Sequence, residues 1–105
     1  MDIRENNLKY LIDNHKDIYG AYTQYGRAIH ESGGPLDDKT RWLIKISTSA
    51  TQSCLFALKT HIEKAVRSGC TREEIEHAIL LIAPTAGFPR MMEALLVLRE
   101  ELGED

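Results

Sequence analysis

Apolar residues recur in steps of three and four along most of this chain, which is the period of an α-helix. The repeat lasts for about six turns in the first third of the sequence. Its apolar positions there are Leu8, Leu11, Ile12, Ile18, Tyr19, Tyr22, Tyr25 and Ile29. No stretch of useful length alternates with period two, as a half-buried strand would. The pattern therefore predicts an all-helical fold.

Turn-forming and capping residues divide this pattern into separate helices. The Gly-Gly-Pro sequence at 33–35 ends the first segment, and the Asp-Asn pair at 13–14 could cap a second helix within it. Asp37 is the expected N-cap of the next helix. Ser and Thr are poor residues for helix interiors, so the Ser/Thr-rich stretch 47–53 predicts a break, with Gln52 or Ser53 beginning a new helix.

Three further helices are expected in the second half of the chain. The first ends at Gly69, and a capping box of Thr71 and Glu74 begins the second, which ends near Pro84. The third follows the Gly-Phe-Pro turn at 87–89. The predicted core positions are Leu55, Leu58, Ile62, Ala65 and Val66, then Ile75, Ala78, Ile79 and Ile82, and finally Met92, Leu95, Leu96, Val97, Leu98 and Leu102.

A chain of 105 residues is the size of one domain, and we expect a single domain over residues 1–105 with about five to six helices. The helices from Leu55 and from Met91 onward are apolar on more than one face. A short chain offers little surface to cover both faces, so the pattern favours a homo-oligomer. The alternative is a monomer with a well-buried central helix.

The charge balance excludes some classes of partner. The formal net charge is -3, the isoelectric point is near 5.8, and no basic stripe is visible. We therefore expect neither nucleic acid nor an anionic membrane surface as a partner. The N-terminus has no apolar signal-peptide core, and the longest nearly apolar run, 78–83, is too short to span a bilayer. We expect a cytoplasmic protein.

Cys54 and His61 are the candidate catalytic residues. Cys54 lies near the start of a predicted helix, where amide dipoles favour a thiolate, although free cysteines are often simply buried. His61 is nearly two turns further on the same face, at a rise of roughly 10.5 Å, so a direct bond to Cys54 within that helix is not expected. The helical neighbour of His61 is Ala57, which cannot titrate. The alternative is a histidine satisfied in a core or an interface.

The remaining cysteine and histidines carry no site prediction. Cys70 would lie on the order of 20 Å from Cys54 at the far end of one helix, so no bridge between them is expected, and we interpret Cys70 as a structural loop residue. His15, His30 and His77 show no metal-ligand spacing. Phosphate-binding glycine loops and the hydrolase nucleophile elbow are both absent. We expect no metal and no cofactor.

Four segments of the chain together resemble a known family. The segments are 36–41 (LDDKTR), 54–61 (CLFALKTH), 65–75 (AVRSGCTREEI) and 86–89 (AGFP). They are similar in order and spacing to the carboxymuconolactone decarboxylase and alkylhydroperoxidase D superfamily, over roughly residues 15–100. The resemblance implies an all-helical bundle of the alkylhydroperoxidase D type that assembles into trimers or hexamers.

The peroxidase branch of this superfamily uses a glutamate followed by C-x-x-C-x-x-x-H. Carried over by the resemblance, the first cysteine falls on Cys54 and the histidine on His61. The peroxide-attacking cysteine falls on Ala57 and the glutamate on Trp42. Two relay positions are therefore lost, and a dithiol cycle within one chain has no second thiol.

The decarboxylase branch keeps the histidine without the cysteine pair, and it removes carbon dioxide from a lactone acid. His61 would then be a general acid or base, with Arg41, Lys45 or Arg90 available to bind a carboxylate. Three hypotheses follow: a peroxidase-like oxidoreductase that uses Cys54 with an external thiol reductant, a cofactor-free decarboxylase or isomerase that acts at His61, and a non-enzymatic oligomeric domain. The sequence favours the first, because Cys54 stands at a helix start.

Overall fold

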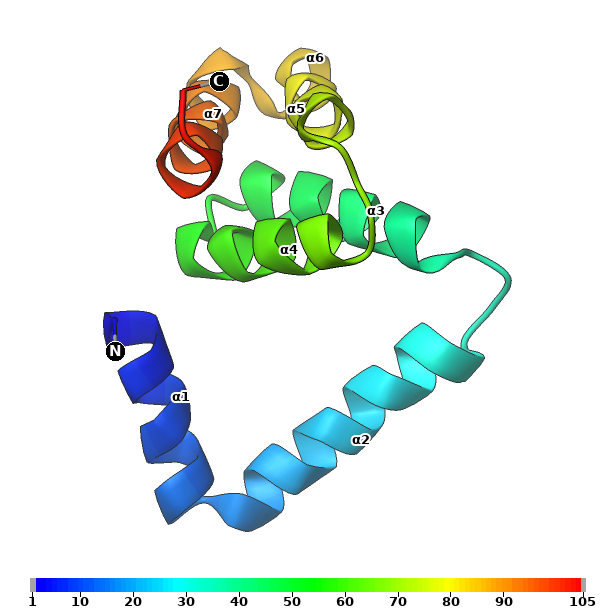
Figure 1. The fold of residues 1–105 in the computed structure, drawn as a ribbon, viewed down its shortest axis with the longest axis vertical. Coiled ribbons are helices and arrows are strands. Elements are labelled where there is room, and N and C mark those ends of the chain that lie inside the picture. The colour runs from blue at the N-terminus through cyan, green and yellow to red at the C-terminus, as the bar shows by residue number, and fades with distance from the viewer. Residues whose placement is uncertain (1, 105) are drawn as a thin grey trace. The chain divides into compact units, whose positions relative to one another are not determined.

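The computed structural model describes residues 2–104, and all the regular structure in that range is helical. The chain forms two compact units, one up to Pro35 and one from Leu36 onward (Figure 1). The all-helical prediction is confirmed. The organisation of residues 1–105 as a single domain stays a prediction.

The first unit is a pair of helices, α1 (Ile3–Asn14) and α2 (Lys16–Ser32). They meet at His15, whose backbone lies outside the helical region at φ -144° and ψ 57°. The predicted division of the first segment therefore occurs, one residue after the Asp-Asn pair. No residue of either helix is buried. Tyr22 and Tyr25 of the apolar stripe are both more than two-thirds exposed.

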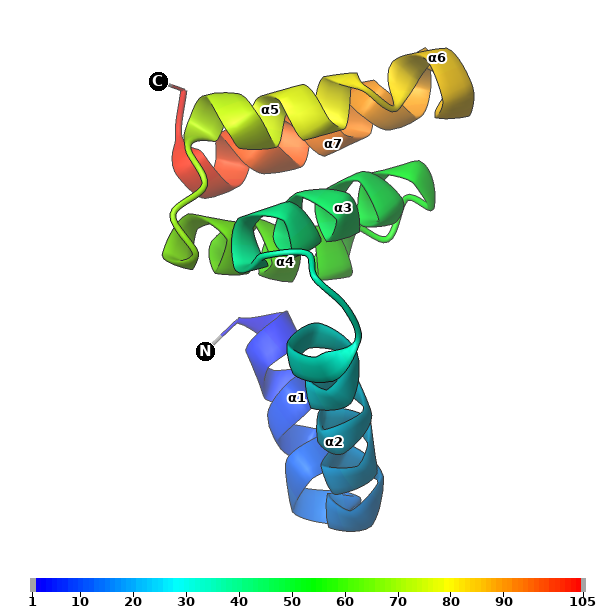
Figure 2. The same ribbon diagram turned by 90° about the vertical axis from the view of Figure 1, so that its right-hand side faces the viewer.

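The second unit contains α3 (Asp38–Thr51), α4 (Leu55–Arg67), α5 (Arg72–Leu80), the single turn α6 (Ala83–Ala86) and α7 (Phe88–Leu102). Helices α3 and α4 form one layer, and α5 and α7 form a second layer upon it (Figure 2). Helix α3 packs on α5 and α4 packs on α7. Their shared core includes the fully buried residues Ile46, Leu58, Ile62, Ile75, Ile79 and Leu98.

Several details of the second unit differ from the sequence prediction, among them Val66 of α4, a predicted core residue that is 45% exposed. Helix α3 runs on through the Ser/Thr stretch to Thr51, because hydroxyls there bond to carbonyls, as Thr48 does to Ile44 at 3.0 Å. In α7 the buried stripe is Met91, Ala94, Val97 and Leu98, whereas the predicted core residues Met92 and Leu96 are about half exposed. The predicted helical period of α7 is therefore correct, but the face that is buried is rotated about the helix axis from the predicted face.

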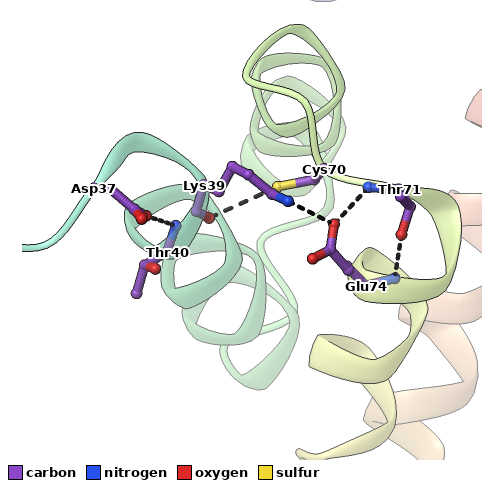
Figure 3. Close-up of polar contacts among 6 residues, drawn as sticks. All are labelled: Asp37, Lys39, Thr40, Cys70, Thr71 and Glu74. Carbon is purple, nitrogen blue, oxygen red and sulfur yellow. Dashed lines mark hydrogen bonds and ion pairs between the residues drawn. The ribbon is translucent and has the colours of Figure 1, made fainter.

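The starts of α3 and α5 are joined through three side chains (Figure 3). The Lys39 ammonium lies 3.2 Å from Oε1 of Glu74, and that same carboxylate oxygen accepts from the Thr71 amide at 2.8 Å. Thr71 Oγ1 in turn accepts from the Glu74 amide at 3.1 Å, which completes the predicted capping box. The bond from the Thr71 amide, then the Lys39 ammonium, holds the pKa of Glu74 below its ordinary value.

Cys70 lies beside this junction as a buried free thiol. Its sulfur donates weakly to the carbonyl of Lys39 at 3.7 Å (Figure 3). Burial, and then the Glu74 carboxylate, raise the pKa of this thiol, so the neutral form is favoured. The thiol therefore packs in the loop between α4 and α5, where its chemistry favours a structural role.

Candidate functional site

The turn between α3 and α4 positions Cys54. It passes through Ser53 at φ +55°, a left-handed conformation that residues other than glycine seldom adopt. Cys54 is then the N-cap of α4, and its amide donates to the carbonyl of Ser49 at 2.9 Å. The new helix thus begins two to three residues later than predicted, because the turn itself takes up Gln52 and Ser53.

Helix α7 supports this turn from the second layer. The Ser53 hydroxyl donates to the Glu93 carboxylate at 3.2 Å, and the Arg90 guanidinium donates to the carbonyl of Thr51. These two bonds come from residues about forty positions away in the chain. The left-handed residue is therefore held by tertiary contacts as well as by the local turn.

The Cys54 thiol is exposed and free of any disulfide. Its sulfur lies 3.8 Å from the backbone oxygen of Gln52 and 3.9 Å from the side-chain oxygen of the same residue. Both oxygens accept hydrogen bonds, so they match a thiol that donates S–H. A thiolate is instead stabilised by donors and cations. Exposure makes Cys54 accessible, but these two neighbours do not activate it.

His61, in the middle of α4, is partly buried against α3. Its Nδ1 lies 2.6 Å from the hydroxyl oxygen of Ser49 and 3.2 Å from the carbonyl oxygen of Lys45. Ser49 is 5% exposed, and its hydroxyl donates to that same Lys45 carbonyl at 2.9 Å. One nitrogen of the ring is therefore held in a buried polar network built by the neighbouring helix.

Trp42 also lies beside the imidazole. The two ring centroids lie 5.8 Å apart with their planes tilted by 41°. Two ammonium groups stand over the same indole ring, Nζ of Lys45 at 5.2 Å and Nζ of Lys64 at 5.3 Å from its centroid. Tryptophan thus connects the histidine to a pair of cations, at the position where the resemblance implies a glutamate in other members.

The pKa of Lys45 responds to its surroundings. Partial burial, and then the positive charge of Lys64, lower the pKa of Lys45 below its ordinary value. A bound anion near these ammonium groups would offset their positive charge. The site is therefore electrostatically suited to a carboxylate or a developing oxyanion beside His61.

The structure brings together only some of the residues that the sequence suggested. Cys54 Sγ makes its hydrogen bonds with Gln52, and His61 Nδ1 makes its bonds with α3. Ala57 is exposed. Of the three cations proposed for a carboxylate, Arg41 contacts Leu36 and Asp38, Arg90 contacts Thr51, and only Lys45 lies beside the Trp42–His61 pair.

Sequence reasoning missed Ser49 and Lys64. Neither residue stands at a motif position, and Ser49 comes from another helix, twelve residues before His61. The small residues of 47–53 pointed to a close approach of helices, but they could not identify its partner. In residues 2–104 no group of three or more His, Cys, Asp or Glu side chains could hold a metal ion. None of the helices described is both long and apolar enough to cross a membrane.

The protein is thus an all-helical protein in which His61 is held between α3 and α4. Trp42 lies beside His61, and the ammonium groups of Lys45 and Lys64 lie over the Trp42 ring. Comparison with known proteins agrees with this description. The model of the carboxymuconolactone decarboxylase family matches residues 16–100, from the start of α2 into α7. The chain belongs to the carboxymuconolactone decarboxylase family, and the resemblance drawn from the sequence is confirmed.

Two relatives extend the comparison. The chain is 32% identical over 97 residues to the uncharacterized protein MJ1511 of Methanocaldococcus jannaschii, an alignment that covers 92% of this chain and 90% of that protein. It is 33% identical over 70 residues to the uncharacterized protein 4 in cox locus of Paracoccus denitrificans, which covers 64% of this chain and 63% of that protein. The names of these two relatives state no reaction.

Proposed function

We propose that this protein is a cofactor-free acid–base enzyme that acts on a small carboxylated compound, with decarboxylation of a lactone acid as the reaction class. The observation that carries the proposal is the juxtaposition at His61. Its Nδ1 is held by Ser49, and its ring lies against Trp42, which bears the ammonium groups of Lys45 and Lys64. A positioned histidine beside paired cations suits proton transfer on an anion.

The chemistry divides between the histidine and the lysines. When the carbon–carbon bond to the carboxylate breaks, carbon dioxide leaves and the electron pair passes into the lactone system as an enolate. Protonated His61 then delivers its proton to carbon. A cation paired only with the leaving carboxylate would stabilise the ground state. We therefore assign Lys45 and Lys64 to the enolate oxygen, or to a second carboxylate that remains in the product.

A second candidate is peroxide reduction by Cys54, supported by the exposure of its thiol at the start of α4. A thiolate would attack the peroxide, forming a sulfenic acid and releasing an alcohol or water. An external thiol would condense with the sulfenic acid to form a mixed disulfide, releasing water. A second external thiol would attack that mixed disulfide, which regenerates the Cys54 thiol and releases the disulfide of the two external thiols. The oxygen acceptors around Cys54 and the alanine at 57 make this reaction the weaker proposal.

We also propose that the chain works as a homo-oligomer. Large apolar side chains of the second unit are exposed on α4, on α7 and on the residue after α5: Phe56 at 60%, Leu81 at 61%, Phe88 at 64% and Leu96 at 54%. Exposed apolar surface of this kind marks interaction sites. Light scattering coupled to size-exclusion chromatography would test assembly, and a purely monomeric species at micromolar concentration would contradict it.

Carbon dioxide release from a panel of small carboxylated lactones tests the main proposal. His61→Gln should reduce turnover by about a hundredfold or more, because it removes the proton donor. Lys45→Met should chiefly raise KM if it binds a carboxylate, or lower kcat if it stabilises the enolate. The matched control is His77→Gln, which changes an exposed histidine on α5 and should leave turnover unchanged.

The same preparations separate the rival functions. Cys54→Ser should leave decarboxylation intact, while it should abolish peroxide consumption in the presence of an external thiol if the second candidate is correct. If the His61→Gln variant turns over every lactone as fast as the unmodified protein, the acid–base proposal fails. If neither activity is measurable in the native oligomer, the non-enzymatic hypothesis holds.

A further inference from the structure

The contacts of His61 identify which of its two ring nitrogens carries the proton. Nδ1 lies 3.2 Å from the carbonyl oxygen of Lys45, and a carbonyl oxygen can only accept a hydrogen bond. An unprotonated Nδ1 would direct its lone pair at that oxygen and be repelled. The contact is favourable only when Nδ1 carries a hydrogen.

The hydroxyl of Ser49 supports the same assignment. It has one proton, and the Lys45 carbonyl at 2.9 Å is an acceptor for that proton. The hydroxyl oxygen therefore faces Nδ1 as an acceptor at 2.6 Å. With Ser49 only 5% exposed, little water is available to replace either bond.

We propose that Ser49 is a positioning residue that holds His61 in the Nδ1–H tautomer, so that the lone pair of the neutral ring resides on Nε2. Ser49 thereby selects the nitrogen through which His61 accepts and returns a proton. An unconstrained imidazole in water prefers the opposite tautomer, with hydrogen on Nε2. The tautomer can be measured without any substrate, and only its catalytic consequence rests on the proposed function.

Nitrogen-15 NMR of the imidazole side chains tests this assignment in the native protein. Long-range proton–nitrogen correlations distinguish a protonated ring nitrogen from an unprotonated one, and the His61→Gln variant identifies the His61 signals. At a pH where the ring is neutral, Nδ1 should show the protonated shift and Nε2 the unprotonated shift. The opposite pattern in the unmodified protein would overturn the proposal.

Two serine variants on the same helix isolate the role of Ser49. Ser49→Ala should move the His61 nitrogen shifts toward the solution mixture of tautomers. The matched control is Ser47→Ala, which removes a partly buried hydroxyl that bonds to the Ala78 carbonyl at 2.8 Å. It should leave the His61 shifts unchanged. If Ser49→Ala folds normally by its amide spectrum and keeps the pure Nδ1–H pattern, the Lys45 carbonyl suffices and the role of Ser49 is refuted.

Kinetics supply a separate readout. With a carboxylated lactone that the protein decarboxylates, Ser49→Ala should lower kcat by about tenfold with little change in KM. The His61 ring would be misoriented in this variant, while Lys45 and Lys64 remain. A positive tautomer result without any His61-dependent turnover would leave the assignment of Ser49 standing and would contradict only the proposed reaction.

Discussion

Ser49 Oγ and His61 Nδ1 lie 2.6 Å apart across the α3–α4 hairpin, although twelve residues separate them in the chain. The helical neighbour of His61 one turn earlier is Ala57, which offers the ring no polar group. The polar partner of the histidine therefore comes from the preceding helix. This relationship places the polar contacts of His61 Nδ1 at the interface of α3 and α4.

Restoring the missing thiol should create an oxidisable pair. Ala57→Cys places two exposed cysteines three residues apart in the first turn of α4. With oxidised glutathione, we expect a disulfide between residues 54 and 57, detected by mass spectrometry of the peptides. The matched control, Ala57→Cys combined with Cys54→Ser, should form only a mixed disulfide. Persistence of both free thiols in the single variant would contradict the expected geometry.

The two native cysteines should differ in reactivity. Cys54 is exposed, whereas Cys70 is 7% exposed with its pKa raised by burial and by Glu74. A chromogenic disulfide reagent should modify the Cys54 thiol quickly. It should modify the Cys70 thiol at least about tenfold more slowly until the protein unfolds. The Cys54→Ser variant should lose the fast phase. Two equal fast phases in the native protein would show that Cys70 is not protected.

The left-handed turn should be sensitive to side-chain shape. A β-branched residue is strained at the φ of +55° that Ser53 adopts, so Ser53→Val should lower the free energy of unfolding by about 1–2 kcal/mol. Ser53→Gly relieves strain while it loses the bond to Glu93, and it should remain within about 1 kcal/mol of the native value. Urea denaturation measures both. Equal values for the two variants would rule out backbone strain as the cause.

Stability should fall in acid partly through Glu74. Its pKa is held below the ordinary value of 4.5, first by the Thr71 amide and then by Lys39. A carboxyl with a depressed folded pKa adds stability above its unfolded pKa and loses it as the pH falls through the folded pKa. The difference in unfolding free energy between the native protein and Glu74→Gln should thus be largest above pH 4.5 and shrink below it. A difference that stays constant from pH 7 to strong acid would exclude this linkage.

Much of the fold follows from local patterns in the sequence. The capping box at Thr71 and Glu74 and the helical N-cap at Asp37 both form as expected, since each depends on residues within one turn. The stripe of Leu58, Ile62 and Ala65 on α4 is also buried. Periodicity determines such features because side chains spaced by three or four residues share one face wherever the helix lies.

Other features required the packed structure. Helix α7 is apolar on more than one face, so its sequence permits more than one buried face. Contact with α4 and α5 selects the face that contains Met91 and Ala94. The backbone of residues 47–51 stays helical because the hydroxyls of this segment have carbonyl acceptors within reach, including the carbonyl of Ala78 in α5.

The sequence by itself determined the helical class, the caps at Asp37 and Thr71 and the family, and it proposed Cys54 and His61 as site residues. Only the tertiary structure decided what those residues contact. Ser49, the Lys45 carbonyl and Trp42 meet His61, and Lys64 reaches Trp42, because helices α3 and α4 pack side by side. The register of that packing depends on the whole core. The spacing of residues in the sequence determines which side chains share a face of one helix. It does not determine which residues of two helices contact each other, because that depends on how the helices pack.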